Sequence, residues 1–331
     1  MLLVFDGNNL AWAGFHALRR PLKAETPAQK TRASLLGMTG MLVTLVVRGG
    51  EPPAPGSRQV PADPNPLSEL VLAFDEGRPL RRRSIYAGYQ LGREGDPNFI
   101  DNEPFILEAI AQLCEAARSL PITILRGENT EADDLVAAHV LSSRHDRVRI
   151  ASTDRDFLQL VDERTSIYAP VKRLVIDDAN FSEMTSPRSA DDRPVIFPRE
   201  RFLDYRAASG DASDNLPGIP GVGALTAAKL LAYAPLDAYF EDPQLVSGAL
   251  GRRNPKLEAA LATPEARQAV ARNRELMDLR QAAKHFQDLS PYERAGSWDE
   301  TTFRAWVKDQ RIAGIEIEAA CRAFASVAQR R

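Results

Sequence analysis

Three predicted strands in the first half of the chain each end at or shortly before an aspartate. They are the apolar runs at residues 2–5 and 70–74 and the strand at residues 148–151, and the aspartates are Asp6, Asp75 and Asp154. Helical spacing of apolar side chains is seen over residues 34–48, 104–120 and 131–142. Strands that alternate with helices in this way predict an α/β fold, with a mostly parallel sheet flanked by helices. In such a sheet the ligand site lies beyond the carboxyl ends of the strands, where these aspartates fall.

The charge balance excludes one simple class, the strongly basic nucleic-acid binder. The 331 residues include 42 basic and 45 acidic side chains, so any basic surface must be local and offset by a local acidic site. Cys114 and Cys321 lie far apart without zinc-like spacing, which indicates inert thiols in a reducing compartment. The chain has no apolar run of about 18 residues, and its N-terminus is typical of a buried strand rather than a signal peptide. We therefore expect a cytoplasmic monomer without membrane contact.

Acidic side chains gather at the predicted strand ends and helix starts of five segments. They are Asp6, Asp75, Glu131, Asp133, Asp134, Asp154, Asp156, Asp211 and Asp214. Taken singly, each is usually a turn residue or a helix cap. Delivered together to one edge of a sheet, they cannot all stay ionised without cations. Because the set holds carboxylates and neither His nor Cys, it predicts two Mg²⁺ or Mn²⁺ ions that activate water and stabilise charge on a phosphodiester.

Residues 131–134 start a predicted helix. Thr130 is placed to cap this helix, with Asp133 at the third position after it, as in a capping box. Glu131 and Asp134 then share one face, near a helix N-terminus that favours negative charge. A cap explains one acid but not three in four residues, so this segment independently indicates a metal site.

A basic segment, residues 78–93, follows Asp75 closely. Its phosphate-pairing cations and stacking rings are Arg78, Arg81, Arg82, Arg83, Arg93, Tyr86 and Tyr89. This composition is typical of a surface for single-stranded nucleic acid, and a solvated basic helix face is the alternative. Its position beside a candidate metal ligand favours the nucleic-acid interpretation.

Residues 210–231 combine acids with a Gly/Pro-rich turn and a following helical run. Glycine turns that open a helix expose backbone N–H groups to phosphate. The residues placed to contact phosphate are Gly218, Gly221, Gly223, Thr226 and Lys229. They predict a helix–hairpin–helix element that grips a duplex backbone without reading its sequence, and an ordinary helix–turn–helix connection is the alternative.

Three other stretches complete the organisation. Residues 49–66 are rich in Pro and Gly and are expected to form an exposed, mobile loop. Residues 166–169 and 174–176 predict a hairpin around residues 171–173. From about residue 198 onward the pattern is helical, most clearly over residues 263–281.

Several motifs give the chain a family resemblance over residues 1 to about 280. They are FDGNNL at 5–10, FDEG at 74–77, YQLGR at 89–93, EADDL at 131–135, STDRDFLQL at 152–160 and DYRAASGDASDNLPGIPGVG at 204–223. In this order they resemble the 5′ nucleases of the flap endonuclease superfamily. They are similar in particular to the 5′→3′ exonuclease domain of bacterial DNA polymerase I and to free-standing bacterial and phage 5′ exonucleases.

The resemblance implies a metal-dependent 5′→3′ exonuclease and structure-specific flap endonuclease for DNA replication or repair. Its substrates would be DNA 5′ ends, flaps and junctions, together with RNA–DNA primers. It implies a PIN-like core over residues 1–197 with a helical arch at about 76–105, and a helix–three-turn–helix region over 198–280 with a bound K⁺. Residues 281–331 form a C-terminal extension to which the resemblance assigns no role.

The resemblance also implies roles for single residues. The nine acids would be metal-site residues, some acting through water. Arg82 matches the arch arginine that assists the scissile phosphate, and Tyr89 matches an aromatic that stacks a base. Arg81, Arg83, Tyr86 and Arg93 would contribute to DNA binding around them.

Two of the chain's departures from the family pattern change single motif residues. Gln90 stands where the family usually has lysine, so a cation that would stabilise the transition state is missing. Ala224 and Leu225 stand in place of the usual Glu-Lys before Thr226. These departures leave a non-catalytic or weakened DNA-binding relative as the alternative, and a PIN-like ribonuclease is a third interpretation that residues 204–231 argue against.

Overall fold

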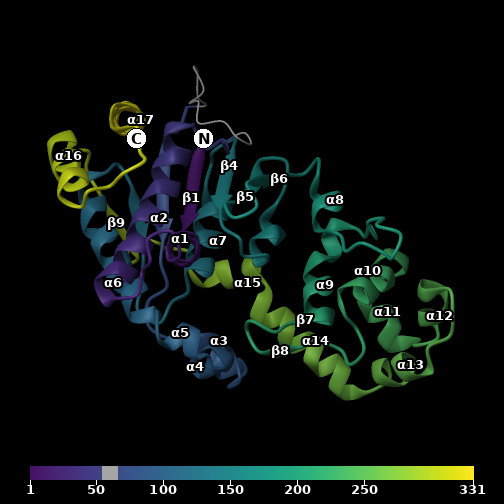
Figure 1. The fold of residues 1–331 in the computed structure, drawn as a ribbon. Helices are drawn as coiled ribbons and strands as arrows, with labels where there is room; N and C mark the ends of the chain where they lie inside the picture. The colour runs from purple at the N-terminus through teal and green to yellow at the C-terminus, as the bar shows by residue number, and fades with distance from the viewer. Residues whose placement is uncertain (54–65) are drawn as a thin grey trace. The chain divides into compact units, whose positions relative to one another are not determined.

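A seven-stranded sheet organises the computed structural model, which describes residues 1–53 and 66–331 (Figure 1). The strand order is β6-β5-β4-β1-β2-β3-β9. The strands are β1 Leu2–Asp6, β2 Glu69–Ala73, β3 Thr123–Leu125, β4 Val148–Ala151, β5 Thr165–Ala169, β6 Leu174–Ile176 and β9 Glu293–Ala295. The five from β5 to β3 run parallel, and β6 and β9 pair antiparallel at the two edges. The predicted α/β fold with a mostly parallel sheet and the predicted hairpin of β5 and β6 are thus confirmed.

The helices of the first unit include those that cover both faces of this sheet. They are α1 Gly7–Leu18, α2 Pro27–Val47, α5 Pro97–Ile100, α6 Glu103–Ala116, α7 Ala132–Ser142, α16 Glu300–Asp309 and α17 Ile317–Arg330, with short 3₁₀ helices at Ala117–Ser119, Asp156–Leu160 and Ala283–His285. Leu3 and Phe5 of β1 are buried in one core with α1, α2, α6 and α17. Leu2 and Val4 point to the other face and are equally buried, where α7 contacts β1, β2 and β3. Burial on both faces explains why residues 2–5 of β1 form a continuous apolar run.

The described chain divides into two compact units. The first comprises residues 1–78, 97–177 and 282–331, and the second comprises residues 79–96 and 178–281. The division differs from the domain limits expected from sequence. The expected arch at 76–105 is shared between the units, and the second unit begins near residue 178 rather than 198.

The second unit is helical apart from one small hairpin. Its helices are α3 Leu80–Ile85, α4 Leu91–Gly95, α8 Phe181–Thr185, α9 Phe202–Ser209, α10 Ala224–Tyr233, α11 Leu236–Glu241, α12 Leu245–Leu250, α13 Pro255–Leu261 and α14 Pro264–Met277, with a 3₁₀ helix at Arg199–Arg201. The short helix α15 Leu279–Ala282 ends at its boundary with the first unit. The hairpin pairs β7 Gly210–Asp211 with β8 Leu216–Pro217. The helical pattern predicted after residue 198 is therefore present.

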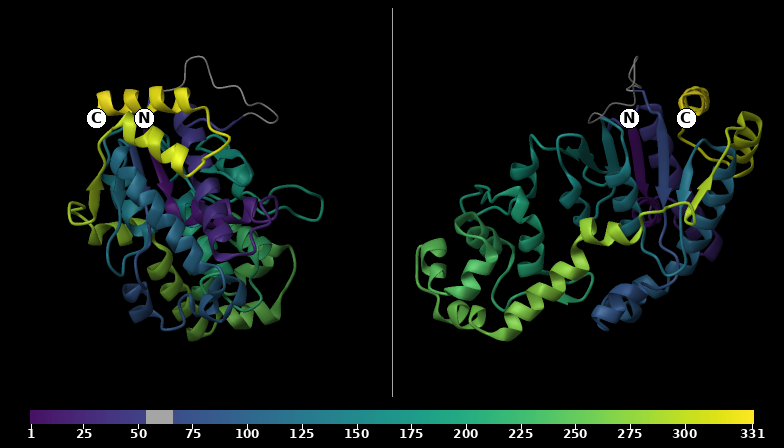
Figure 2. Two further views of the ribbon diagram at one scale, coloured as in Figure 1. Left: turned by 60° about the vertical axis from the view of Figure 1, so that its left-hand side comes forward. Right: turned by 180° about the vertical axis from the view of Figure 1, so that it is seen from behind.

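The C-terminal segment returns to the first unit. Its strand β9 pairs with β3, and α17 packs against α2 near the N-terminus (Figure 2). Phe303 of α16 and Phe324 of α17 are buried, with ring centroids 5.4 Å apart. Residues 282–331 therefore extend the sheet and cover one of its faces, a role that the sequence did not predict.

A local signal sets the start of one helix earlier than predicted. Helix α2 begins at Pro27, before the predicted residue 34, because Thr26 and Gln29 form a capping box. Residues 156–160 form a 3₁₀ helix. The predicted loop at 49–66 falls mainly on residues 54–65, which lie outside the described residues. Over the remainder, no helix is both long enough and apolar enough to cross a membrane.

Candidate active site

The carboxylate of Asp6 lies where β1 passes into α1. Its Oδ1 accepts a hydrogen bond from the Asn9 N–H at 3.1 Å, so that Asp6 caps the helix. Its Oδ2 accepts from the Ser152 hydroxyl at 2.7 Å. Because Ser152 directly follows β4, this contact joins the carboxyl ends of two adjacent strands.

The turn after β4 arranges two further acids. The Asp154 N–H donates to Ser152 Oγ at 2.9 Å, and the Asp156 N–H donates to Asp154 Oδ1 at 2.8 Å. Asp156 then opens the 3₁₀ helix and is only 8% exposed. Asp6, Ser152, Asp154 and Asp156 thus form one hydrogen-bonded chain along the edge of the sheet.

Asp75 lies just beyond β2 and connects it to two helices. Its N–H donates to Asn8 Oδ1 in α1 at 2.9 Å. Its carboxylate accepts from the Ala132 N–H at the start of α7 at 2.7 Å. The predicted cap by Thr130 is therefore wrong: Glu131 occupies the N-cap position without a side-chain bond, and the Thr130 hydroxyl donates to the Glu128 carbonyl. An acid from a neighbouring strand has taken the place of a local cap.

Sequence reasoning missed three polar residues that hold this edge together. Asn8 supports Asp75, and Ser152 supports Asp6. Asn9 is paired with Thr153, whose N–H donates to Asn9 Oδ1 at 2.9 Å. The signal was available in the FDGNNL motif, where two amide side chains directly follow the acid at a strand end.

The pKa of Asp133 is affected by the other acids of the first unit. Burial raises its pKa well above the usual range, and the negative charges of four acids raise it further. In order of effect these acids are Asp154, Asp6, Asp75 and Glu131. Acids from four separate segments therefore act on one another electrostatically.

The same edge suits a hard cation by its chemistry. Its acids offer carboxylate oxygens, the ligands that Mg²⁺ and Mn²⁺ prefer, and their mutual repulsion is what a bound cation would relieve. Across residues 1–53 and 66–331, no three His, Cys, Asp or Glu side chains are yet arranged to hold a metal ion. The acids instead accept hydrogen bonds from backbone N–H groups and from Ser152.

Asp211 and Asp214 lie in the second unit, where each pairs with an arginine. Asp211 forms an ion pair with the buried Arg206 and accepts from the Ser213 N–H at 2.8 Å. Burial alone would raise the pKa of Asp211, but the hydrogen bonds from Ser213 and the Arg206 charge lower it overall. Asp214 Oδ1 lies 3.0 Å from the Arg93 guanidinium. Asp211 is thereby held in its charged form, and Asp214 is paired with a permanent cation.

Two residues of the basic segment are largely buried in the second unit. Arg82 is 2% exposed, and its Nε donates to the Leu276 carbonyl at 2.9 Å. Tyr89 is 3% exposed and packs with Leu216, Leu276 and Met277. The Arg82 guanidinium carbon lies 5.8 Å from the Tyr89 ring centre. In this arrangement both side chains tie the segment to α14.

The remaining residues of the segment are more accessible. Arg83 pairs with Glu94 at 2.8 Å, and the Arg272 guanidinium carbon lies 4.4 Å from the ring centre of Tyr86. Gln90 has a left-handed backbone with φ of 58°, and its N–H donates to the Asp214 carbonyl at 3.0 Å. Arg81 is half-buried.

The glycine turn before α10 contains one glycine with no space for a side chain and one with open space around it. A Cβ added at Gly218 would lie 2.3 Å from the Ala208 carbonyl oxygen. The two backbone segments therefore lie too close together for any side chain at residue 218. At Gly223, the N-cap of α10, an added Cβ would meet nothing within 4 Å. Gly221 has φ of 81°. Thr226 and Lys229 follow on α10 and are half-buried.

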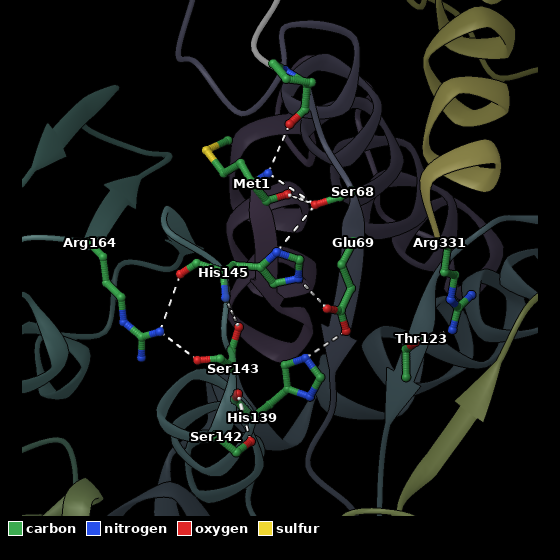
Figure 3. A network of polar contacts seen from close by, with 11 residues as sticks. Met1, Ser68, Glu69, Thr123, His139, Ser142, Ser143, His145, Arg164 and Arg331 are labelled. Carbon is green, nitrogen blue, oxygen red and sulfur yellow. Dashed lines mark hydrogen bonds and ion pairs between the residues drawn. The ribbon is translucent and has the colours of Figure 1, made fainter.

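A second polar network lies at the amino end of β2, away from the acidic edge (Figure 3). Glu69 accepts hydrogen bonds from His139 Nε2 at 2.9 Å and from His145 Nε2 at 2.8 Å. The hydrogen bond from His139 is the main cause that lowers the pKa of Glu69 to about 2. These three side chains help to line a cavity of about 670 Å³. The network joins the start of β2 to the end of α7.

Comparison with known proteins matches both parts of the chain to one family. Residues 1–186 match the model described as 5′-3′ exonuclease, N-terminal resolvase-like domain. Residues 197–299 match the model described as 5′-3′ exonuclease, C-terminal SAM fold.

Among curated proteins, DNA polymerase I of Mycobacterium bovis is 33% identical over 283 residues, which cover 84% of this chain and 27% of that protein. DNA polymerase I of Bacillus subtilis is 30% identical over 233 residues, covering 70% of this chain and 22% of that protein. The chain thus spans about a quarter of the length of these relatives.

Among solved structures, the fold is similar to the 5′-exonuclease of bacteriophage T5 with bound divalent zinc. The TM-score is 0.61 at 18% identity, and the match covers 96% of this chain and 99% of that one. A second match is the T5 D15 flap endonuclease in a pseudo-enzyme-product complex with DNA and metal ions, with a TM-score of 0.60 at 17% identity over 96% and 98% of the two chains. At this identity the likeness concerns the fold alone.

Proposed function

Because this chain belongs to the 5′-3′ exonuclease family, we propose that it is a metal-dependent 5′→3′ exonuclease and structure-specific 5′ flap endonuclease. It would hydrolyse phosphodiester bonds in DNA, at 5′ ends, flaps and junctions, and in RNA–DNA primers. Its role would be in DNA replication or repair, as a monomer in the cytoplasm.

The observation that carries the proposal is the shared field of acids at the carboxyl edge of the sheet. The Ser152 hydroxyl joins Asp6 at the end of β1 to the turn after β4, and Asp75 beyond β2 accepts from the first N–H of α7. Burial and the charges of the neighbouring acids also raise the pKa of Asp133, which supports a crowded acidic site. Maintaining mutually repelling carboxylates is unfavourable for folding alone. Their presence is readily explained if cations and a phosphodiester bind there.

We propose that two Mg²⁺ or Mn²⁺ ions bind to the acids of this edge, some through water. The acids concerned are Asp6, Asp75, Glu131, Asp133, Asp134, Asp154 and Asp156, and we propose Asp211 and Asp214 as further members of the set. When bound, the ions would lower the pKa of a water molecule and neutralise charge on the scissile phosphate. The chain's own contribution is to hold the carboxylates in fixed orientations, as Asn9 and Ser152 do for Asp6.

The second unit would hold the DNA. The glycine turn at 218–223 and the start of α10 present backbone N–H groups, and Lys229 adds a cation, so this element suits the phosphates of a duplex. A K⁺ ion at this turn is part of the proposal. The more accessible arginines and tyrosine of residues 78–93 would contact the substrate near its 5′ end; they are Arg78, Arg81, Arg83, Tyr86 and Arg93.

A panel of substrates tests this proposal. End-labelled 5′-flap, nicked, gapped and RNA-primed duplexes would be incubated with Mg²⁺ or with EDTA. We expect Mg²⁺-dependent cleavage that starts from the 5′ end or at the flap junction, and no cleavage with EDTA. Absence of metal-dependent cleavage on every 5′-ended substrate would reject the enzyme assignment.

A weakened or non-catalytic DNA-binding relative is the second candidate, favoured by one observation. Gln90 provides no cation at the position where the family has lysine, and its neighbours Arg82 and Tyr89 are largely buried. This candidate predicts that the chain binds flapped DNA tightly but leaves it uncut in saturating Mg²⁺, an outcome that the same panel would reveal.

A further inference from the structure

Ser152 lies between two of the proposed metal-binding acids. It directly follows β4 and is 0% exposed. Its hydroxyl donates to Asp6 Oδ2 at 2.7 Å, and its oxygen accepts the Asp154 N–H at 2.9 Å. The direction of both bonds is fixed, because the carboxylate can only accept and the backbone N–H can only donate.

These bonds restrict the carboxylate of Asp6. The Asn9 N–H occupies one site on Oδ1, and the Ser152 hydroxyl occupies one site on Oδ2. With both oxygens anchored, the plane of the carboxylate is fixed before any cation arrives.

Ser152 also stabilises the turn after β4 that contains Asp154 and Asp156. Its acceptance of the Asp154 N–H fixes the backbone at that residue, and Asp154 in turn accepts the Asp156 N–H. A single buried hydroxyl thus couples the end of β1 to the whole turn after β4.

We propose that Ser152 is a positioning residue for cation binding, one that orients Asp6 and Asp154 together without contacting the ion. The proposal rests on the proposed function, because it presumes that these acids hold a divalent cation. Outer partners of this kind typically change metal affinity by about 10–100-fold when they are removed.

The competing explanation is that Ser152 merely satisfies its own buried hydroxyl. Ser34 provides a matched control for that explanation. It is also 0% exposed, and its hydroxyl donates to the Ala11 carbonyl at 3.0 Å. Ser34→Ala and Ser152→Ala therefore delete the same atom from equally buried sites in the first unit, and they differ in whether the partner is a proposed metal-binding acid.

The test is a Mn²⁺ titration of the full chain without DNA, followed by electron paramagnetic resonance of the free ion. We expect Ser152→Ala to weaken Mn²⁺ binding by about 10–100-fold and Ser34→Ala to leave it unchanged. In flap cleavage, Ser152→Ala should raise the Mg²⁺ concentration needed for half-maximal rate, and most of the rate should return at saturating Mg²⁺.

Each outcome of this titration decides between the explanations. Equal Mn²⁺ affinity of Ser152→Ala and the unchanged chain would overturn the positioning role while leaving the proposed function intact. Failure of the unchanged chain to bind Mn²⁺ would overturn both. If Ser152→Ala does not fold, Ser152→Cys fills the same space with a weaker donor, and it should show the same loss.

Discussion

Asp75 has two roles that a single substitution can separate. It is a member of the crowded acid set, and it raises the pKa of Asp133 by its charge. It also accepts the Ala132 N–H and so replaces a local cap at the start of α7. The first role needs a charge, whereas the second needs only an oxygen acceptor. At the scale of the residue, one side chain of the candidate site therefore also stabilises a helix of the fold.

Substitution of Asp75 should separate these two roles. Asp75→Asn keeps an acceptor for the Ala132 N–H but removes the charge, so we expect flap cleavage to fall by more than about 100-fold, beyond the loss typical of an outer partner. Asp75→Ala should lose the same activity and in addition be less stable than Asp75→Asn by about 0.5–2 kcal/mol, the value of a helix cap. Urea unfolding and single-turnover cleavage measure both effects. Equal stability of the two variants would contradict the capping role.

Gln90 tests whether the missing cation limits the rate. Gln90→Lys should raise the single-turnover cleavage rate by roughly tenfold, equivalent to about 1.4 kcal/mol of transition-state stabilisation. Gln90→Met is the control, because it is similar in length, uncharged, and also loses the bond to the Tyr89 hydroxyl. An unchanged or slower rate for the lysine variant would show that this position does not limit turnover.

The candidate site could be predicted from sequence for its acids but not for their partners. Asp6, Asp75 and Asp154 were recognisable because a strand end fixes where an acid lies. Asn8, Asn9 and Ser152 were not, because an amide or hydroxyl is common in any turn and only the pairing of distant strands reveals its partner. Arg82 and Tyr89 were assigned to DNA from composition and from the family resemblance, neither of which indicates that their side chains are buried.

At the scale of the element, local signals and tertiary contacts compete at the ends of helices. The capping box of Thr26 set the start of α2, whereas a strand-end acid overrode Thr130 at the start of α7. In the glycine turn before α10, tertiary contacts constrain one glycine but not the other. Gly218 is required by a backbone approach from α9, and Gly223 is not required by any neighbouring atom.

The two glycines should respond differently to the same change. Gly218→Ala places a Cβ 2.3 Å from the Ala208 carbonyl oxygen, so we expect lower stability and weaker binding of duplex DNA. Gly223→Ala meets no atom within 4 Å and keeps its N–H, so both properties should be preserved. Thermal unfolding and fluorescence anisotropy with a duplex measure the pair. Normal duplex binding by Gly218→Ala would contradict the proposed role of the turn.

The Glu69 network ties β2 to α7, and its effect on stability should depend on pH. The folded pKa of about 2 lies below the ordinary 4.5. The charged carboxylate therefore adds stability above pH 4.5, and this stability is lost as pH falls toward 2. Glu69→Gln should reduce the free energy of unfolding at pH 6 by at most about 3 kcal/mol, and the gap from the unchanged chain should shrink below pH 4.5.

Urea unfolding between pH 3 and pH 6 measures this gap. Glu128→Gln, at an exposed position in the same unit, serves as the control for the loss of one negative charge. A gap for Glu69→Gln that stays constant over this range would show that the two histidines do not stabilise the charged form.

At the scale of the whole molecule, the sheet explains why distant segments cooperate. The central strands β4, β1 and β2 are adjacent and parallel, so acids that follow them meet at one edge. Strand type and direction could be predicted from apolar runs and helical spacing. The return of residues 282–331 to the first unit could not, because β9 is short, exposed and polar, and its place is set by pairing with β3.

The central claim is that the acids of this edge bind divalent cations and carry phosphodiester hydrolysis. Single-turnover cleavage of a 5′-flapped duplex in Mg²⁺ tests it most directly, comparing the unchanged chain with Asp156→Asn, which keeps the size of this buried side chain. We predict cleavage at the flap junction by the unchanged chain, its loss with EDTA, and a loss of more than about 100-fold for a folded Asp156→Asn. Undiminished cleavage by that variant, or cleavage that persists in EDTA, would contradict the account.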